Sequence, residues 1–341
     1  MIKLFIPEEQ MPFWAKSKPA RRFRLFFATD VHGSEPTFRK FINAGKFYNV
    51  DVLVLGGDIT GKMLVPIIAL GNGSYRATLQ SHLYNLNKED LPEFMNRLAK
   101  LGFYSSEMSE REYLELAKDP DRINRLYLEK ANERLVAWIK WAEEKLAGTN
   151  LRCFVTGGND DAKEVVDTLN RAAKERVIAC EEKLVSLNNE GHTMVSLGYS
   201  NPTPWKTPRE IEEPELALHI KAAFEGLENC EKVIFNMHVP PVDSTLDTCP
   251  QLDLSTDPPT VITAGGEPVY FGAGSQAVRD AIERYQPLLS LHGHIHESRN
   301  VTKIGRTTAV NPGSEYGEGV LRGIIVSIAG DKVESTQMTS G

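Results

Sequence analysis

The stretch Val52–Gly61, VLVLGGDITG, decides how the rest of this chain is interpreted. The β-branched and aliphatic run Val52–Leu55 is typical of a strand that is buried on both faces of a sheet. Gly56 and Gly57 then allow a sharp turn, because they have no Cβ. Asp58 follows directly, so its carboxylate would face a crevice above the end of the strand. From this stretch alone, the alternative that Asp58 only caps a helix stays open.

The composition fits a globular protein with a sizeable core. Of the 341 residues, 41% are hydrophobic and 25% are charged, as in ordinary soluble domains. The formal net charge is −7, and an acidic chain lacks the clustered Lys and Arg that hold long nucleic acid by its phosphates. This argues against long nucleic acid as a partner and leaves a small anionic substrate open.

Cysteine spacing and hydropathy indicate the cellular compartment in which the protein is expected. The four cysteines lie far apart and form no C-x-x-C pair, which predicts neither a zinc knuckle nor a disulfide framework. Reduced thiols are usual in the cytoplasm. No apolar run approaches the roughly 18 residues needed to cross a bilayer, and the N-terminus has no signal-peptide core. We therefore expect a cytoplasmic protein without membrane contact, and a homo-oligomer stays open.

Strand-like and helical runs alternate around the opening stretch. Phe23–Ala28 has the pattern of a buried strand, Glu35–Phe47 has helical spacing, and Asp51–Leu55 is the central strand. This order is a βαβ unit, which implies two parallel strands joined by a right-handed crossover. Residues 1–21 form a leader that Trp14 would attach to the body of the protein.

The later segments complete the expected architecture. Residues 62–150 lack strand-like runs and are expected to be a mostly helical insertion within one domain. Its helices are expected at Asp90–Leu101, Ser109–Lys118 and Asp121–Leu146. A further helix is expected at Arg209–Leu227 and an irregular loop at residues 239–274. The strands after residue 300 suggest an antiparallel meander that completes a second sheet.

Polar residues stand at the ends of five strand-like runs. They are Asp30 and His32 after Phe23–Ala28, Asp58 in the opening stretch, Asn159 after Leu151–Thr156, His238 after Lys232–Met237, and His294 and His296 after Pro287–Leu291. Imidazole, carboxylate and amide groups together suit borderline divalent ions such as Mn²⁺, Fe²⁺, Zn²⁺ or Ni²⁺. Seven ligands are too many for one typical site, and they fit two ions about 3.5–4 Å apart that share a bridging carboxylate. A single histidine of this kind is usually structural, but five strand ends with the same chemistry are hard to explain that way.

These residues carry a resemblance to a known family. The series Asp30-x-His32, Gly57-Asp58, Gly158-Asn159-Asp160, His238 and Gly293-His294-x-His296 resembles the calcineurin-like metallophosphoesterases, motif for motif and in order. The likeness covers roughly residues 23–328 apart from the insertion. His238-Val-Pro-Pro, Leu291–Ser298 (LHGHIHES) and Asn311-Pro-Gly-Ser are similar in particular to the bacterial and archaeal small phosphoesterases that are related to the cyclic-nucleotide phosphodiesterases.

The resemblance implies a fold and an activity. The fold would be α/β, a four-layer αββα sandwich of two mixed sheets, with residues 1–341 as a single metallophosphoesterase domain. One divalent ion would be held by Asp30, His32 and His296 and a second by Asn159, His238 and His294, with Asp58 as the bridge and manganese as our first choice of metal. A hydroxide between the two ions would attack a small phosphodiester, a nucleotide being one candidate. The catalytic residues would be Asp58, Asn159 and Asp160.

One position departs from the family pattern. Many members carry a His after the motif Asn, as a general acid or a transition-state clamp, whereas this chain has Asp160. An Asp near its reference pKa is ionised at pH 7 and is a poor proton donor unless burial raises its pKa. Either the leaving group departs unassisted, or another residue supplies the proton, with His192 and His292 as candidates. This departure favours phosphodiesters or activated esters over simple alkyl monoesters.

Two other functions stay open, as does the choice of substrate contacts. A phosphomonoesterase would use the same site, and a non-catalytic scaffold would use the same fold, as a retromer subunit does. A scaffold can lose metal ligands, whereas every ligand position is filled here. Residues 62–150 and 239–274 flank the expected site and would cover it. Lys62, Arg76 and Trp205 are therefore candidate substrate contacts, although a solvated or packing role explains each of them equally well.

Overall fold

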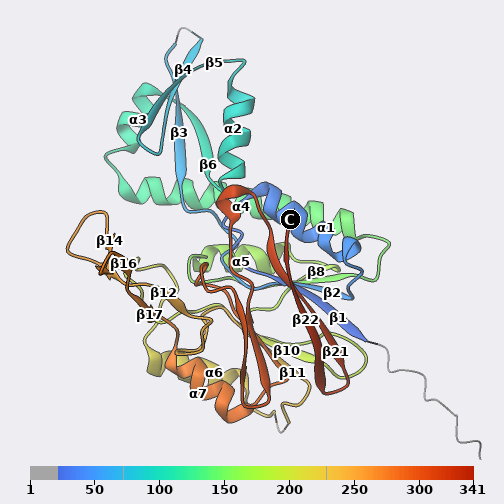
Figure 1. Cartoon of the computed structure of the whole chain (residues 1–341). Helices are drawn as coiled ribbons and strands as arrows, with labels where there is room; N and C mark the ends of the chain where they lie inside the picture. The colour runs from blue at the N-terminus through green and yellow to red at the C-terminus, as the bar shows by residue number, and fades with distance from the viewer. Residues whose placement is uncertain (1–21, 72, 228) are drawn as a thin grey trace, which may run out of the picture.

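Two mixed sheets organise the computed structural model, which describes residues 22–71, 73–227 and 229–341 (Figure 1). The first sheet contains β1 (Phe23–Ala28), β2 (Val52–Leu55), β7 (Arg152–Val155), β8 (Val177–Ala179), β21 (Arg322–Ala329) and β22 (Lys332–Ser340), in the order β22-β21-β1-β2-β7-β8. The strands β1, β2, β7 and β8 are parallel, β21 pairs antiparallel with β1, and β22 pairs antiparallel with β21. The expected leader and Trp14 lie outside the described residues.

The second sheet repeats this plan. It contains β9 (Leu184–Ser186), β10 (Thr193–Leu197), β11 (Val233–Met237), β18 (Leu289–Leu291), β19 (Asn300–Ile304) and β20 (Thr307–Asn311), in the order β19-β20-β18-β11-β10-β9. Four of its strands are parallel, and the two edge strands, β9 and β19, are antiparallel to their neighbours. The predicted mixed α/β class is therefore confirmed.

Side chains of β1 show how the cores arise, because successive residues of a strand point to opposite faces. Leu25 and Phe27 belong to a core shared with residues of the second sheet, including Ile234 and Leu289. Phe26 on the other face packs with α1 (Glu35–Phe47), α4 (Pro120–Leu146) and α5 (Lys163–Ala172). The outer face of the second sheet shares a third core with α6 (Glu213–Ala223) and α7 (Gln276–Tyr285). Both faces of each sheet are thus buried, as the unbroken apolar run of β2 predicts.

The expectation that residues 62–150 are mostly helical is wrong in one respect. The segment also holds a four-stranded sheet of β3 (Leu64–Ala69), β4 (Ser74–Leu79), β5 (His82–Asn87) and β6 (Tyr104–Ser109), in the order β5-β4-β3-β6. Polar residues and one proline in these strands hide the apolar alternation. The helices α2 (Leu91–Lys100), α3 (Glu110–Leu116) and α4 do lie where the spacing predicts them. Sheet and helices form a lobe that projects at the top of Figure 1.

A junction of backbone against backbone holds this lobe to the body. A Cβ on Gly61 would overlap the carbonyl oxygen of Gly102, and a Cβ on Gly102 would overlap that of His32. The Arg134 guanidinium donates to the carbonyl oxygens of Gly33 (2.9 Å) and Phe103 (2.8 Å) and so ties α4 to both sides. The chain next to Gly61, including Lys62, is consequently fixed relative to the first sheet.

Three other expectations need correction. The helix expected from Arg209 begins only at Glu213, because residues 198–211 form a loop held by side-chain hydrogen bonds. The irregular loop 239–274 contains short ladders, β12 (Thr248–Pro250) with β17 (Tyr270–Gly272), β13 (Leu252–Asp253) with β14 (Thr260–Val261), and β15 (Thr263–Ala264) with β16 (Glu267–Pro268). The C-terminal strands do not form one meander, because β19 and β20 join the second sheet whereas β21 and β22 join the first. A 3₁₀ turn, Tyr316–Glu318, separates the two pairs.

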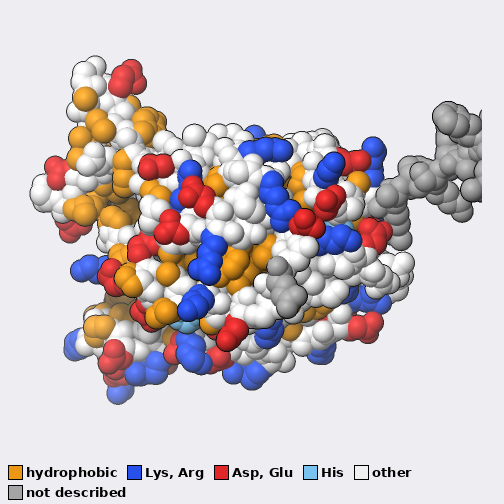
Figure 2. Space-filling view, turned by 90° about the horizontal axis from the view of Figure 1, so that it is seen from below, with side chains coloured by type: hydrophobic (Ala, Val, Ile, Leu, Met, Phe, Trp, Pro, Cys, Tyr) orange, Lys and Arg blue, Asp and Glu red, His pale blue; other side chains and the backbone are white. Residues whose placement is uncertain are grey.

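The surface carries mixed charge. On the face shown in Figure 2, Lys and Arg side chains lie among Asp and Glu side chains and form no continuous basic strip. Across residues 22–71, 73–227 and 229–341, no helix has both the length and the apolar character required to cross a membrane.

Candidate metal centre

The residues expected as ligands all follow parallel strands at their C-terminal ends. Those of β1, β2 and β7 come from the first sheet, and those of β11 and β18 come from the second. Backbone hydrogen bonds continue past the strand ends, from Asp30 N to Gly57 O (3.0 Å) and from His32 N to Asp58 O (2.9 Å). Gly293 N donates to His238 O in the same way (2.9 Å). The loops that carry the ligands are therefore extensions of the sheets.

Four of the expected ligands have left-handed backbone conformations. They are Asp30 (φ 53°), His32 (φ 39°), Asp58 (φ 48°) and His294 (φ 66°). Such a conformation costs a residue other than glycine of order 1 kcal/mol or more and clusters at functional sites. Asp58 is not a helix cap: the backbone N–H of Asp160 donates to its Oδ1 (3.0 Å), and no helix begins at Asp58. The alternative left open by the sequence is thus removed.

The first group of facing ligand atoms joins β1 to β18. Asp30, His32 and His296 each present one ligand atom, and all three atoms lie within 4.8 Å of one another. The Nε2 atoms of His32 and His296 are 3.1 Å apart, and His296 Nε2 is 3.3 Å from Asp30 Oδ1. Two imidazole nitrogens that face each other either share one proton or face a common cation. This group is the one that the resemblance implies for the first ion.

The second group lies around Asp58. Its Oδ2 atom is 3.4 Å from His238 Nε2 and 3.5 Å from His32 Nε2, so one carboxylate oxygen faces histidines on both sides. Asn159 Oδ1 lies 2.8 Å from His294 Nδ1, and the rings of His238 and His294 are 5.5 Å apart. The arrangement brings all seven expected ligands together. Asp30 also lies near His238 (3.8 Å), which makes a grouping of Asp30, Asp58 and His238 equally compact.

The charges of the cluster favour a cation. Burial raises the pKa of Asp30, but His238 and His296 outweigh this effect and hold the pKa well below its usual range. Burial likewise raises the pKa of Asp58, and His238 and His32 more than reverse it. Burial lowers the pKa of His238, but Asp58 and Asp30 raise it to about 10. Burial lowers the pKa of His32 to about 3 and that of His294 to about 4, so both rings stay neutral and keep a lone pair for a ligand bond.

One orphaned atom tests whether the site fits a metal ion. His238 is fully buried, and its Nδ1 lies 3.0 Å from the carbonyl oxygen of Gly56, which fixes the proton on Nδ1. Its Nε2 has no hydrogen-bond partner among the described residues and faces Asp58. A buried ring nitrogen that faces two carboxylates requires a positive charge there, which is either a proton, as the raised pKa of His238 indicates, or a metal ion bound to the lone pair of Nε2. The donor set therefore fits a divalent cation.

Asp160 and Lys62 form an ion pair beside the cluster. Lys62 Nζ is 2.9 Å from Asp160 Oδ2, and the same oxygen is 3.5 Å from His32 Nδ1. Burial and the negative Asp58 raise the pKa of Asp160 to about 6, against the opposing effect of Lys62. The ring of Tyr316, half-buried, lies 4.6 Å from that of His32 and stands perpendicular to that of His296. No local signal in the sequence marks Tyr316, because it follows no strand end and belongs to no motif.

The other candidate substrate contacts and proton donors have interaction partners outside the ligand cluster. Arg76 pairs with Glu110 within the lobe (3.1 Å), whereas Trp205 is 62% exposed and its backbone N–H donates to Thr203 Oγ1. His292 is fully buried, and its ring nitrogens lie 2.7 Å from Ser290 Oγ and 2.9 Å from Met237 O. His192 stacks on Phe23 and lies 2.7 Å from Gly330 O. Each imidazole therefore has structural partners of its own.

Asp161, which follows Asp160, links two loops beside the cluster. It is fully buried and accepts from the backbone N–H groups of Ile59 (2.9 Å), Thr60 (2.9 Å) and Gly158 (2.8 Å). Its carboxylate thereby ties the loop after β2 to the loop after β7. The second Asp in Asn159-Asp160-Asp161 was the available signal for this link.

Comparison with known proteins gives one clear relative. No family model matches the chain. Over 173 residues, the chain is 32% identical to the uncharacterized protein MJ1162 of Methanocaldococcus jannaschii, and these residues are 50% of this chain and 68% of MJ1162. The chain belongs to the family of MJ1162. No activity comes with this membership.

Solved structures share the fold. One crystal structure matches with a TM-score of 0.54 at 14% identity and covers 94% of this chain and 99% of its own. The structure of TT1561 of Thermus thermophilus matches with a TM-score of 0.50 at 13% identity, with the same coverage. At such identities, likeness extends to the fold alone.

Proposed function

We propose that this chain is a metal-dependent phosphoesterase of the calcineurin-like type, with two divalent ions and with the helix and sheet layers in αββα order. The observation that supports this proposal best is the convergence of Asp30, His32, Asp58, Asn159, His238, His294 and His296 from five strand ends on one cluster. The unpartnered Nε2 of His238 supports it independently. Two such ions, manganese first among the candidates, would supply Lewis acidity and lower the pKa of a bound water toward neutrality.

Three residues of the chain would have separate roles at this centre. Asp58 would bridge the ions, because its Oδ2 faces histidines on both sides. Asp160 occupies the sequence position of the family's usual His and is paired with Lys62, so we assign the clamp role to this ion pair. Lys62 is half-exposed, and its ammonium group can turn from Asp160 to a phosphoryl oxygen at small cost, since a partly solvated ion pair is worth about 1 kcal/mol or less.

The substrate class follows from this pair. A Lys point charge stabilises charge on a phosphoryl oxygen, but an ammonium with a raised pKa is a weaker general acid for a leaving alkoxide than a histidine that titrates near neutral pH. Burial lowers the pKa of Lys62, but Asp160 and Asp58 outweigh this effect and hold it above the usual value, so the ammonium is retained. We therefore favour small phosphodiesters or activated esters over alkyl monoesters.

Hydrolysis of bis(p-nitrophenyl) phosphate and of p-nitrophenyl phosphate, each with and without added Mn²⁺, tests the proposal. We expect diester cleavage that chelation abolishes and that Asp58→Asn removes. Diester cleavage that survives both treatments would refute the metal-dependent phosphoesterase. A chain that binds well under one ion would instead favour a non-catalytic scaffold, although the filled ligand set argues against one.

A further inference from the structure

A loop forms several hydrogen bonds with the turn that carries Asn159. Residues 198–211 run beside Gly157–Asp160, and the backbone N–H of Arg209 donates to the carbonyl oxygen of Asn159 (3.0 Å). The Arg209 guanidinium donates to the carbonyl oxygen of Gly158 (3.2 Å) and forms a buried ion pair with Glu181. The backbone of the Asn159 turn is therefore held from outside the site.

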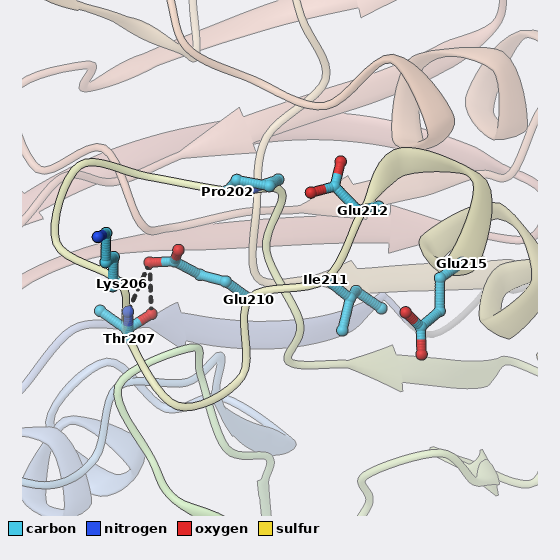
Figure 3. Close-up of a pocket in the computed structure, with 7 residues that line it drawn as sticks. All are labelled: Pro202, Lys206, Thr207, Glu210, Ile211, Glu212 and Glu215. Carbon is cyan, nitrogen blue, oxygen red and sulfur yellow. Dashed lines mark hydrogen bonds between the residues drawn. The ribbon is translucent and has the colours of Figure 1, made fainter.

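The side chain of Asn159 is held by the same loop. Its Nδ2 donates to Thr207 Oγ1 (2.8 Å), while its Oδ1 lies 2.8 Å from His294 Nδ1. Thr207 Oγ1 in turn donates to Glu210 Oε1 (2.8 Å), which also accepts from the backbone N–H of Thr207 (2.8 Å). Figure 3 shows the Glu210 carboxylate reaching Thr207 through these two bonds.

Donor and acceptor counts fix the direction of this chain of bonds. An ionised carboxylate only accepts, and a threonine hydroxyl has one proton to give. Burial raises the pKa of Glu210, but the hydrogen bonds from Thr203 and Thr207 outweigh this effect and hold the pKa below its usual range. Thr207 thus gives its proton to Glu210 and can only accept from Asn159. The amide must then turn its NH₂ to Thr207 and its oxygen to the ligand cluster.

We propose that Thr207 and Glu210 are positioning residues that orient the Asn159 amide so that Oδ1 faces the ion held with His238 and His294. This inference rests on the proposed metal centre and adds to it a control on one of the two ions. Thr207 contacts the cluster through the Asn159 amide nitrogen, Glu210 acts through Thr207, and neither residue belongs to the motifs at the strand ends. Outer hydrogen-bond partners of this kind typically change metal affinity about 10- to 100-fold when they are removed.

Matched variants separate orientation from folding. Thr207→Val keeps the side-chain volume and removes the acceptor, and Thr207→Ser keeps the hydroxyl. Thr203→Val is the control, because Thr203 bonds Glu210 through Oγ1 (2.5 Å) and, among the described residues, no hydrogen bond joins it to Asn159. Valine is preferred to alanine because Thr207 lines a surface hollow of about 390 Å³, from which a water could replace a missing hydroxyl.

The experiment is a calorimetric Mn²⁺ titration of the four chains, beside Mn²⁺ electron paramagnetic resonance of each. We expect Thr207→Val to weaken one of two binding steps about 10- to 100-fold and to lose the spin-coupled signal of a metal pair at limiting Mn²⁺. Thr207→Ser and Thr203→Val should match the wild type within about threefold. Equal affinity in Thr207→Val and wild type overturns the positioning role, as does an equal loss in Thr203→Val.

Failure of the proposed function gives a different result. Wild-type chains that bind two ions but cleave no phosphoester would remove the activity and leave the Thr207 comparison decisive. Wild-type chains that bind no ion would overturn both inferences.

Discussion

Replacing Gly158 by alanine should disable the metal centre through a single methyl group. A Cβ at this position would lie 2.8 Å from Asp58 Cγ and closer still to the Oδ1 and backbone N of Asp58. Non-bonded carbons pack at about 3.5–4.0 Å, so the Asp58 carboxylate must move by at least about 0.7 Å. The φ of Gly158 is not in the left-handed region, so the effect is steric and not conformational.

Two consequences follow from this displacement. Overpacking of a filled site costs about 1–3 kcal/mol in the free energy of unfolding. A misplacement near 1 Å costs a catalytic constellation about 100-fold in rate, and we expect a loss of that order in diester hydrolysis at saturating Mn²⁺. Because Asp58 faces histidines on both sides, Mn²⁺ affinity should fall at both binding steps.

The assay compares Gly158→Ala with Gly317→Ala in Mn²⁺ titration, chemical unfolding and diester hydrolysis. A Cβ on Gly317 meets no atom within 4 Å, and its φ is not left-handed, so that control should stay within about 0.5 kcal/mol of the wild type. Wild-type Mn²⁺ affinity in Gly158→Ala would refute the placement of Asp58 against this turn.

Two further outcomes are expected. Lys62→Met should lower diester turnover about 10- to 100-fold and keep the free energy of unfolding within about 1 kcal/mol of the wild type. Arg76→Met, which breaks an exposed ion pair in the lobe, should change neither quantity. Equal turnover in the two variants would contradict the clamp role of Lys62. Burial lowers the pKa of His192, so the unfolded chain binds more protons below about pH 6.5 and stability falls as the pH drops through that window. His192→Gln should reduce the slope of the free energy of unfolding against pH by up to about 1.4 kcal/mol per pH unit, which corresponds to one proton. His82→Gln, at an exposed site, is the control, and chemical unfolding from pH 4.5 to 7 measures the slope. An unchanged slope in His192→Gln would contradict this prediction.

The sequence indicated the ligand cluster because strand ends and ligand types are both local signals. Asp58 follows an unbroken apolar run and two glycines, and the other ligands follow similar runs. Parallel strands of one sheet end at a common edge, which predicts that the residues after β1, β2 and β7 lie close together, and the family resemblance predicted that the residues after β11 and β18 of the second sheet join them. The same reasoning placed α1 and α4 within one or two residues of their observed bounds.

The sequence did not predict features that depend on contacts between residues far apart along the chain. Residues 64–109 alternate weakly between apolar and polar, and their strands are stabilised by pairing with one another, as Ile67 opposite Ala77 shows. Arg209 and Glu210 have good helix propensity, but Thr203, Thr207 and Glu181 bind them in a loop instead. Tyr316 reaches His32 only because β21 returns to β1 in the first sheet. Tertiary pairing overrides local preference in each case.

Diester hydrolysis measured against bound Mn²⁺ per chain tests the dinuclear centre most directly. Metal-free protein would be titrated with Mn²⁺, with bound ions and bis(p-nitrophenyl) phosphate cleavage recorded on the same samples of wild type and Asp58→Asn. The bridging position of Asp58 predicts that activity rises with the second ion bound to the wild type, and that Asp58→Asn binds less Mn²⁺ and stays inactive. Activity that is complete without metal, or that persists in Asp58→Asn, would contradict it.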